Sequence, residues 1–252
     1  MKKIKLSIEL LSDTCLGSGA GLAGLVDQDL LYDSLGFPMV NGKTVKGWLV
    51  EACADIMAGL GDSTTNKLKE SANRLFGNPG DAMDETLLFI GDAHFPDEIR
   101  KQEVLDLQEL KNSLDELMTA DQDDLKHRSI ISHYNKQVNF VKESYSRIRY
   151  QTAIEDTGVA KDGSLRTIRV INRGNTLVSD LQYFGSKEDE QNDFVLLCAV
   201  VACVRRIGLN RTRGLGRVKC ELSMAGKSDF FKENLEGFAN GLRRDDEDYE
   251  SN

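Results

Sequence analysis

The sequence has few prolines, histidines and cysteines, and these shortages exclude several classes of protein. Its 252 residues include three prolines, three histidines and five cysteines. The cysteines are scattered and odd in number, with no Cys-x-x-Cys pair and no Cys/His cluster, so neither a disulfide framework nor a structural zinc site is supported. The first apolar stretch is too short for a signal peptide, and no segment approaches a membrane span. We therefore expect a cytoplasmic protein with reduced thiols and no membrane partner.

Acidic residues outnumber basic ones overall, yet positive charge is concentrated in one segment. The formal net charge is −9, which argues against a protein that coats nucleic acid non-specifically. Residues 205–217 (RRIGLNRTRGLGR), here called the arginine loop, nonetheless hold five arginines and no acid, interleaved with glycines. Glycine lets the backbone approach a ligand closely, and arginine offers planar forks to phosphate oxygens. The pattern predicts a phosphodiester backbone as the ligand, the alternative being a basic loop that only solvates the end of a helix.

The order of the predicted elements indicates an α+β protein with a ferredoxin-like or RRM-like core. Apolar periodicity predicts core elements in the order strand, helix, strands, helix and strand. They are a strand from Ile4, a helix within 41–60, a strand over 86–95, strands within 145–185, a buried helix over 194–204 and a last strand over 218–225.

We predict one domain over residues 1–240 and a charged tail over 241–252. Two insertions interrupt the domain. One is a charged, helical insertion over 97–144, and the other is a projecting hairpin over 150–175, whose glycines and charges suit an exposed arm.

Three aspartates follow a glycine-rich loop near the N-terminus. Asp27, Asp29 and Asp33 would share one face of an extended segment. An aspartate beside bound RNA can take a proton from a 2′-hydroxyl group or hold a divalent ion. Turn and capping roles are the common alternative for aspartates in loops. The three histidines are dispersed along the chain, so they do not indicate a paired-histidine ribonuclease site.

Two lysines stand beside glycines at the start of the predicted helix within 41–60. Lys43 and Lys46 are placed where lysines at a helix N-terminus can bind an anion. The segment GKTVKG resembles the end of a phosphate-binding P-loop, but Phe37 occupies the position of the first glycine in G-x-x-x-x-G-K-[ST]. Nucleotide hydrolysis of that kind is therefore not supported.

Three blocks of the sequence resemble the RAMP superfamily of repeat-associated CRISPR proteins. They are GSGAGLAGLVDQDLLYDSLGFPMVNGKTVKGWL, NRLFGNPG followed by LLFIGDAHF, and GLNRTRGLGRV. The resemblance runs from about residue 4 to 222 and is weakest over 98–144. Within the superfamily, the chain is most similar to the backbone subunit of type III effector complexes.

The resemblance implies an RRM-like core with a thumb hairpin, in a subunit that stacks along a guide RNA (crRNA) with copies of itself or with paralogues. Target RNA pairs with the guide, and the loop aspartate, here Asp27, cuts the target with a divalent ion, Mg²⁺ or Mn²⁺. The residues placed at RNA are Lys43, Lys46, Arg166, Arg169, Arg211, Arg213, Gly214, Gly216 and Arg217. Base pairing then supplies the sequence recognition, so one cationic track is enough. Two alternatives stay open, namely the same scaffold with an inert Asp27 and a guide-processing endoribonuclease.

Overall fold

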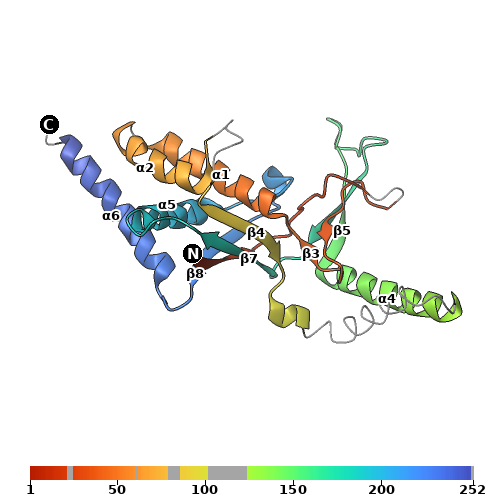
Figure 1. The fold of residues 1–252 in the computed structure, drawn as a ribbon. Helices are drawn as coiled ribbons and strands as arrows, with labels where there is room; N and C mark the ends of the chain where they lie inside the picture. Colours follow the sequence, from red (N-terminus) through yellow and green to blue (C-terminus); the bar gives the residue numbers. More distant parts are fainter. Residues whose placement is uncertain (22–24, 61, 79–85, 102–123, 251–252) are drawn as a thin grey trace.

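The computed structural model describes residues 1–21, 25–60, 62–78, 86–101 and 124–250. The chain mixes helices and antiparallel strands, which confirms the predicted α+β class (Figure 1). The elements are β1 (Lys2–Leu10), β2 (Leu31–Tyr32), β3 (Pro38–Met39), α1 (Gly42–Gly59), α2 (Asp62–Phe76), β4 (Leu88–His94), α4 (Asp124–Tyr145), β5 (Ser146–Gln151), β6 (Arg166–Ile171), β7 (Thr176–Tyr183), α5 (Glu190–Cys203), the 3-10 turn η1 (Arg211–Arg213), β8 (Val218–Met224) and α6 (Phe230–Glu250).

The central sheet has the strand order expected of a ferredoxin-like core. Its four strands lie in the order β4-β7-β1-β8, and each neighbouring pair is antiparallel. Along the chain, α1 joins β1 to β4, and α5 joins β7 to β8. This is the β-α-β-β-α-β arrangement in which the first and third strands lie side by side in the middle of the sheet.

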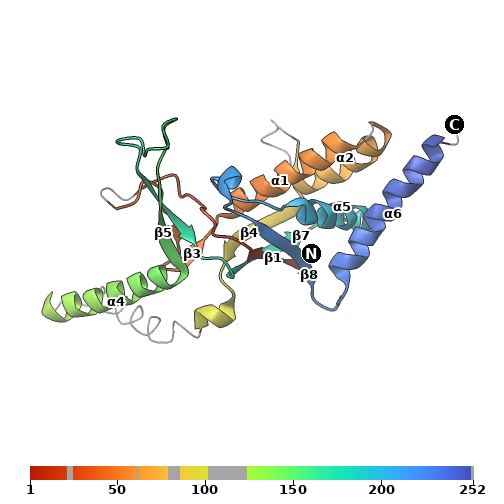
Figure 2. The ribbon, with the colours of Figure 1, turned by 180° about the vertical axis from the view of Figure 1, so that it is seen from behind.

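The two faces of the sheet differ because apolar and polar residues alternate along its strands. In β1, Ile4, Leu6 and Ile8 are each 1% exposed, while Lys3 and Lys5 lie on the opposite, exposed face. Helices α1, α2 and α5 cover the apolar face (Figure 1). Helix α5 packs against α1, α2, α6 and β8, which explains why the helix predicted over 194–204 is apolar on nearly every side. Helix α6 packs on α5 and β8 (Figure 2).

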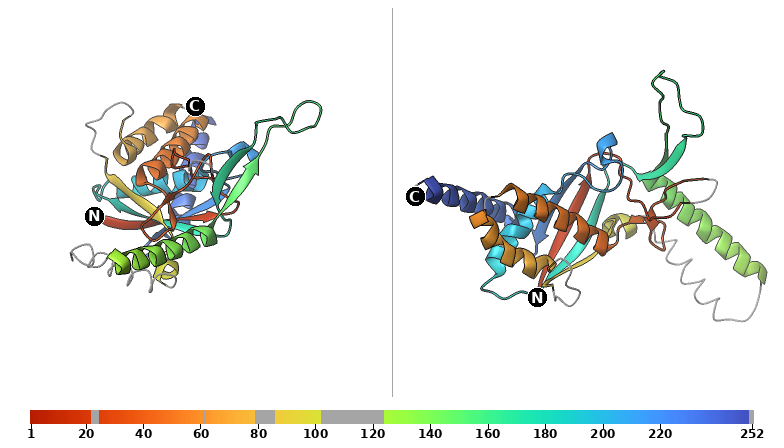
Figure 3. Two further views of the ribbon diagram at one scale, coloured as in Figure 1. Left: turned by 90° about the vertical axis from the view of Figure 1, so that its right-hand side faces the viewer. Right: turned by 90° about the horizontal axis from the view of Figure 1, so that it is seen from above.

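Strands β5 and β6 form a separate ribbon that projects from the body of the molecule (Figure 3). Together with residues 152–165 between them, they are called the arm, and they correspond to the predicted hairpin. A third segment joins the outer edge of β6, because Gln28 forms a parallel bridge with Ile168. Beneath the ribbon lies a small apolar cluster, separate from the main core, that consists of Cys15, Ile168, Val170 and Leu215.

Two further parts of the chain are the helical insertion and the C-terminal segment. Residues 102–123 of the predicted helical insertion lie outside the described residues. From Asp124 the insertion is helix α4, which ends directly at the start of β5. At the C-terminus, α6 continues to Glu250, so most of the segment predicted as a charged tail is helical. In the part of the chain that is described, no helix has the length and apolarity needed to span a membrane.

Candidate nucleic-acid interface

A cavity of about 800 Å³ lies between the arm and the arginine loop, and it is called the arm hollow. Asp27 lines it from the segment beside β6, Arg166 from the start of β6, and Arg213 from the arginine loop. Lys161 and Asp162, from residues 152–165, line it as well. The apolar cluster beneath the arm brings these distant segments together, because it joins β6 to Leu215 of the arginine loop.

Asp27 is held by Thr167 of β6 through one of its two carboxylate oxygens. The backbone N–H of Thr167 donates to Oδ2 at 2.6 Å, and the Thr167 hydroxyl donates to the same oxygen at 3.2 Å. In return, the backbone N–H of Asp27 donates to the Thr167 carbonyl at 2.9 Å. The residue is exposed, and among the described residues its Oδ1 has no hydrogen-bond partner. The structure therefore orients Asp27 while leaving one carboxylate oxygen for a ligand.

The other two aspartates of the predicted group have structural roles. Asp29 Oδ1 accepts the backbone N–H of Leu30 at 2.8 Å and lies 3.1 Å from Arg169 Nε. The Arg169 side chain is only 13% exposed, so this ion pair fastens the loop to the arm. Asp33 closes the turn after β2, and its Oδ2 accepts from Arg100 at 3.0 Å. The turn explanation thus holds for Asp33, whereas Asp29 serves as the partner of Arg169.

The arginine loop is shaped by glycines with positive φ. Gly214 and Gly216 have φ values of 81° and 74°. A Cβ atom at Gly216 would lie 2.0 Å from the carbonyl oxygen of Ile207, so a side chain cannot fit there. The loop then turns back along itself, with a backbone bridge between Arg206 and Arg217. Arg217 is exposed at the end of this turn.

Two arginines of the loop contact other side chains. Arg213 Nη1 donates to Gln151 Oε1 of β5 at 3.4 Å, a weak contact that leaves the guanidinium exposed. Arg211 Nη1 donates to Glu51 Oε1 of α1 at 2.9 Å, an ion pair in which both side chains are about half exposed. The charge of Arg211 is already paired with a carboxylate, whereas Arg213 contacts only a neutral amide, so Arg213 is the more available of the two to an anionic ligand.

The two predicted lysines lie on helix α1. Lys43 and Lys46 occupy the first turn of α1, but neither lines the arm hollow. The N-terminus of this helix is partly satisfied by protein, because the Gly42 N–H donates to Asp92 Oδ1 at 2.7 Å. The face of α1 that carries Thr44 and Trp48 lines a second, smaller cavity with Arg211. The arm hollow thus groups Asp27, Arg166 and Arg213, while the helix that carries Lys43 and Lys46 lines the second cavity together with Arg211.

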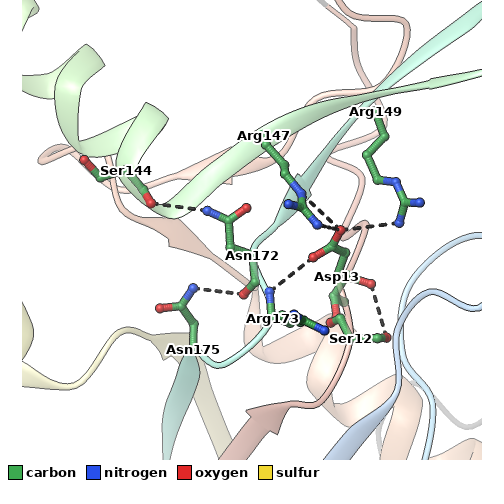
Figure 4. A network of polar contacts seen from close by, with 9 residues as sticks. Ser12, Asp13, Ser144, Arg147, Arg149, Asn172, Arg173 and Asn175 are labelled. Atoms are coloured by element: carbon green, nitrogen blue, oxygen red, sulfur yellow. Dashed lines mark hydrogen bonds and ion pairs between the residues drawn. The ribbon is translucent and has the colours of Figure 1, made fainter.

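A group of polar residues that the sequence patterns did not single out lies at the base of the arm (Figure 4). Asp13 follows β1, and its side chain is 4% exposed. Arg147 of β5 donates to Asp13 Oδ2 from Nε at 3.1 Å and also from Nη2, and Arg149 donates from Nη1 at 3.3 Å. The alternation of arginines in SRIRYQ was a signal that could have identified Arg147 and Arg149. No signal in the sequence marked Asp13.

The resemblance implies a divalent ion at Asp27, and the side chains around Asp27 offer few ligands for one. Among the residues that the structure describes, no three His, Cys, Asp or Glu side chains gather into a group that could hold a metal ion. Mg²⁺, however, commonly keeps its waters and binds through one or two carboxylates together with substrate phosphates. The single free oxygen of Asp27 fits that mode of binding, in which RNA would supply further ligands.

Comparisons with known proteins give the family of the chain. A model of the RAMP superfamily matches residues 7–219. The chain belongs to the RAMP superfamily. Among curated protein sequences, none matches this RAMP protein.

Three solved structures are similar to this RAMP protein, and the two with TM-scores above 0.5 support its fold. One is a chain of the type III-B Cmr-beta complex in the apo state, with 14% identity and a TM-score of 0.54 over 90% of this chain and 98% of that chain. A second is from Cmr-beta bound to cognate target RNA, with 14% identity and a TM-score of 0.58 over 93% and 99%. A third is oligomeric Cmr4 from Pyrococcus furiosus, with 16% identity and a TM-score of 0.47 over 89% and 99%.

Proposed function

We propose that the protein is a guide-RNA-binding backbone subunit of a type III CRISPR effector complex, and that its Asp27 cuts the base-paired target RNA. The observation that carries this proposal is the arm hollow, where Asp27 and Arg213 line one cavity. An exposed carboxylate beside exposed cations is suited to a ribose-phosphate strand, because the cations bind phosphate while the carboxylate meets the sugar. The partners in this proposal are guide RNA, target RNA, copies of the same chain or paralogues, and other effector subunits.

The chemistry follows from what each side chain can do. The Asp27 carboxylate accepts the proton of a target 2′-hydroxyl group. The 2′-oxygen attacks the neighbouring phosphorus in line, so that a P–O2′ bond forms and the P–O5′ bond breaks. Arg213 and Arg166 offset the negative charge that grows on the phosphate oxygens. A divalent ion, Mg²⁺ or Mn²⁺, held by Asp27 and RNA phosphates would supply further positive charge and make the hydroxyl group more acidic.

A non-catalytic scaffold is the second candidate function. Its supporting observation is that Thr167 donates two hydrogen bonds to Asp27 Oδ2, the pattern of a carboxylate that only secures a loop. In that case the subunit would organise guide RNA, and another subunit would cut the target.

The Asp27→Asn substitution in the complete RNA-loaded particle separates the two functions. If Asp27 is the general base, target cleavage falls by about 10²–10⁴-fold, while particle mass and bound guide RNA are unchanged. Asp156→Asn is the matched control, because Asp156 is an exposed acid of the arm that does not line the arm hollow. Cleavage that is unchanged in Asp27→Asn would favour the scaffold. Cleavage that survives a chelator would argue against the divalent ion.

A further inference from the structure

One face of strand β5 carries a row of polar side chains. Arg147, Arg149 and Gln151 alternate along β5 and therefore point to the same side of the arm. Their partners on β6 are Val170, Ile168 and Arg166, in that order. Val170 and Ile168 are buried in the small cluster beneath the arm, which also contains Leu215 of the arginine loop. Because paired residues share a face of the ribbon, Arg147 and Arg149 lie beside that cluster and on the same side as the arginine loop.

The row is organised at one end by the buried carboxylate of Asp13. The guanidinium groups are exposed, with Arg147 at 58% and Arg149 at 46%, whereas the Asp13 side chain is 4% exposed. Arg147 uses Nε and Nη2 on this carboxylate, and Arg149 uses Nη1 (Figure 4). Among the described residues, the remaining nitrogens, Nη1 of Arg147 and Nε and Nη2 of Arg149, have no hydrogen-bond partner. These donors are available to a ligand in solvent.

A third arginine is placed beside the pair by the turn between β6 and β7. The backbone N–H of Arg173 donates to Asp13 Oδ1 at 3.3 Å, and its side chain is exposed. The turn is braced, because the Gly174 N–H donates to the Leu10 carbonyl at 2.8 Å and the Asn172 side chain donates to the Ser144 carbonyl at 3.2 Å. Arg173 is therefore held at the arm base by a defined backbone.

Asp13 also ties the arm to the arginine loop. The Asp13 carbonyl accepts the backbone N–H of Gly216 at 2.9 Å. At the other end of the row, Gln151 contacts Arg213 and lines the arm hollow. The cationic side chains thus form one path, from Arg173 at the arm base, along β5, to the hollow that contains Asp27.

Local charge determines what this path can bind. One carboxylate neutralises one guanidinium, yet Asp13 is shared by Arg147 and Arg149, with Arg173 beside them. The cluster is therefore locally positive, although the protein as a whole is acidic. Partly exposed guanidinium groups with free N–H donors in a fixed geometry are well suited to phosphate oxygens.

We propose that Arg147, Arg149 and Arg173 form a second phosphate-binding row, organised by Asp13, for a single RNA strand that leads into the arm hollow. These three arginines, two on β5 and Arg173 in the turn after β6, are together called the β5 row. The proposal rests on the proposed function, because it requires an RNA strand in the arm hollow. It adds three RNA contacts and gives Asp13 the role of a positioning residue.

The test is the salt dependence of binding, measured by fluorescence anisotropy with the full chain and a labelled single-stranded RNA of mixed sequence. Each phosphate contact on a single strand contributes about 0.7 to the slope of log K against log salt. Arg147→Ala with Arg149→Ala therefore lowers the slope by about 1.4. The control is Lys3→Ala with Lys5→Ala, which removes the same charge from the exposed face of the sheet and leaves the slope within about 0.3 of the wild type.

A second variant covers the case in which the alanine variant unfolds. Arg147→Lys with Arg149→Lys keeps both charges, so the slope is retained, while the affinity falls because lysine lacks the planar fork. If wild-type chain binds RNA and the alanine variant has the same slope as the Lys3/Lys5 control, the β5 row is wrong and the proposed function stands. If the slope falls by about 1.4 but Asp27→Asn still cuts, the row stands and Asp27 is not the base. Wild-type chain that binds no RNA overturns both.

Discussion

Among the residues that the structure describes, Asp193 of the core and Asp13 at the base of the arm are both buried and contact arginine, but their surroundings differ. Asp193 of α5 is 0% exposed. It accepts two hydrogen bonds from Arg74 Nε, at 3.1 and 3.2 Å, one from Arg74 Nη2 at 2.7 Å, and one from the Tyr183 hydroxyl at 2.7 Å. Burial, together with the hydrogen bond to Asp193, raises the pKa of Tyr183, so its hydroxyl stays protonated as a donor.

Asp13 is nearly as buried, but its partners are not. Arg147 and Arg149 are about half exposed, and they outnumber the carboxylate. At Asp193 a fully buried carboxylate meets a buried hydroxyl and a guanidinium that is only 24% exposed, an arrangement that serves packing. A carboxylate shared by two exposed guanidinium groups leaves positive charge directed at solvent. Burial of the partners, rather than burial of the acid, thus distinguishes a structural ion pair from a candidate binding site.

The largest expected effect is on Asp193. Asp193→Ala leaves the buried Tyr183 hydroxyl without its acceptor and removes the carboxylate nearest to the Arg74 guanidinium, so we expect the free energy of unfolding to fall by about 3–5 kcal/mol. Urea denaturation of the full chain measures this loss. Asp180→Ala, at an exposed position of β7, is the control and changes stability by no more than about 0.5 kcal/mol. If Asp180→Ala lowers the free energy of unfolding as much as Asp193→Ala does, the pair of Asp193 and Arg74 has no special role in stability.

A smaller loss of stability is expected at the arm. Asp13→Ala frees two arginines that are already half solvated, so we expect a loss of about 1–3 kcal/mol, to which the Arg173 backbone N–H that loses its acceptor contributes. The same denaturation experiment ranks the two aspartates. If Asp13→Ala destabilises the chain as much as Asp193→Ala, the Asp13 cluster is a structural pair like the other one.

The smallest effect concerns the arginine loop. Arg213→Ala with Arg217→Ala removes two exposed charges, so the slope of log K against log salt for single-stranded RNA falls by about 1.4. Arg211→Ala changes the slope by less than about 0.7, because Glu51 already neutralises much of that charge. Anisotropy titrations at several salt concentrations measure both. An unchanged slope in the double variant would exclude the loop from the RNA track.

Much of the fold could be predicted from the sequence, because periodicity reports which face of an element is buried. The alternation from Ile4 predicted β1, and the apolar run over 194–204 predicted the buried helix α5. Helix α4 could not be placed from its sequence, because Val141 and Tyr145 pack on core residues, such as Phe37, that are distant along the chain. The helical state of residues 241–250 was likewise not predicted, because charged residues carry no apolar periodicity.

The candidate site was predicted less completely. Resemblance selected Asp27 among three similar aspartates, and it grouped Lys43 and Lys46 with the arginine loop. The hydrogen bonds of Asp29 and Asp33 then separated those two from Asp27. No pattern in the sequence paired Asp13 with Arg147, because ion pairs between distant segments depend on how the strands are brought together.

The sequence by itself determined the class of fold, the apolar face of each core element and the one segment rich in arginine. These depend on local spacing and composition, which a chain carries before it folds. Only the tertiary structure decided which charges are neutralised and which stay available, since an acid and an arginine interact according to distance and burial. Glu51 lies 160 positions before Arg211, and Asp13 lies 134 positions before Arg147. The packing of the arm on the arginine loop brings such groups within a few ångströms, and it also places Asp27 in a hollow with cations.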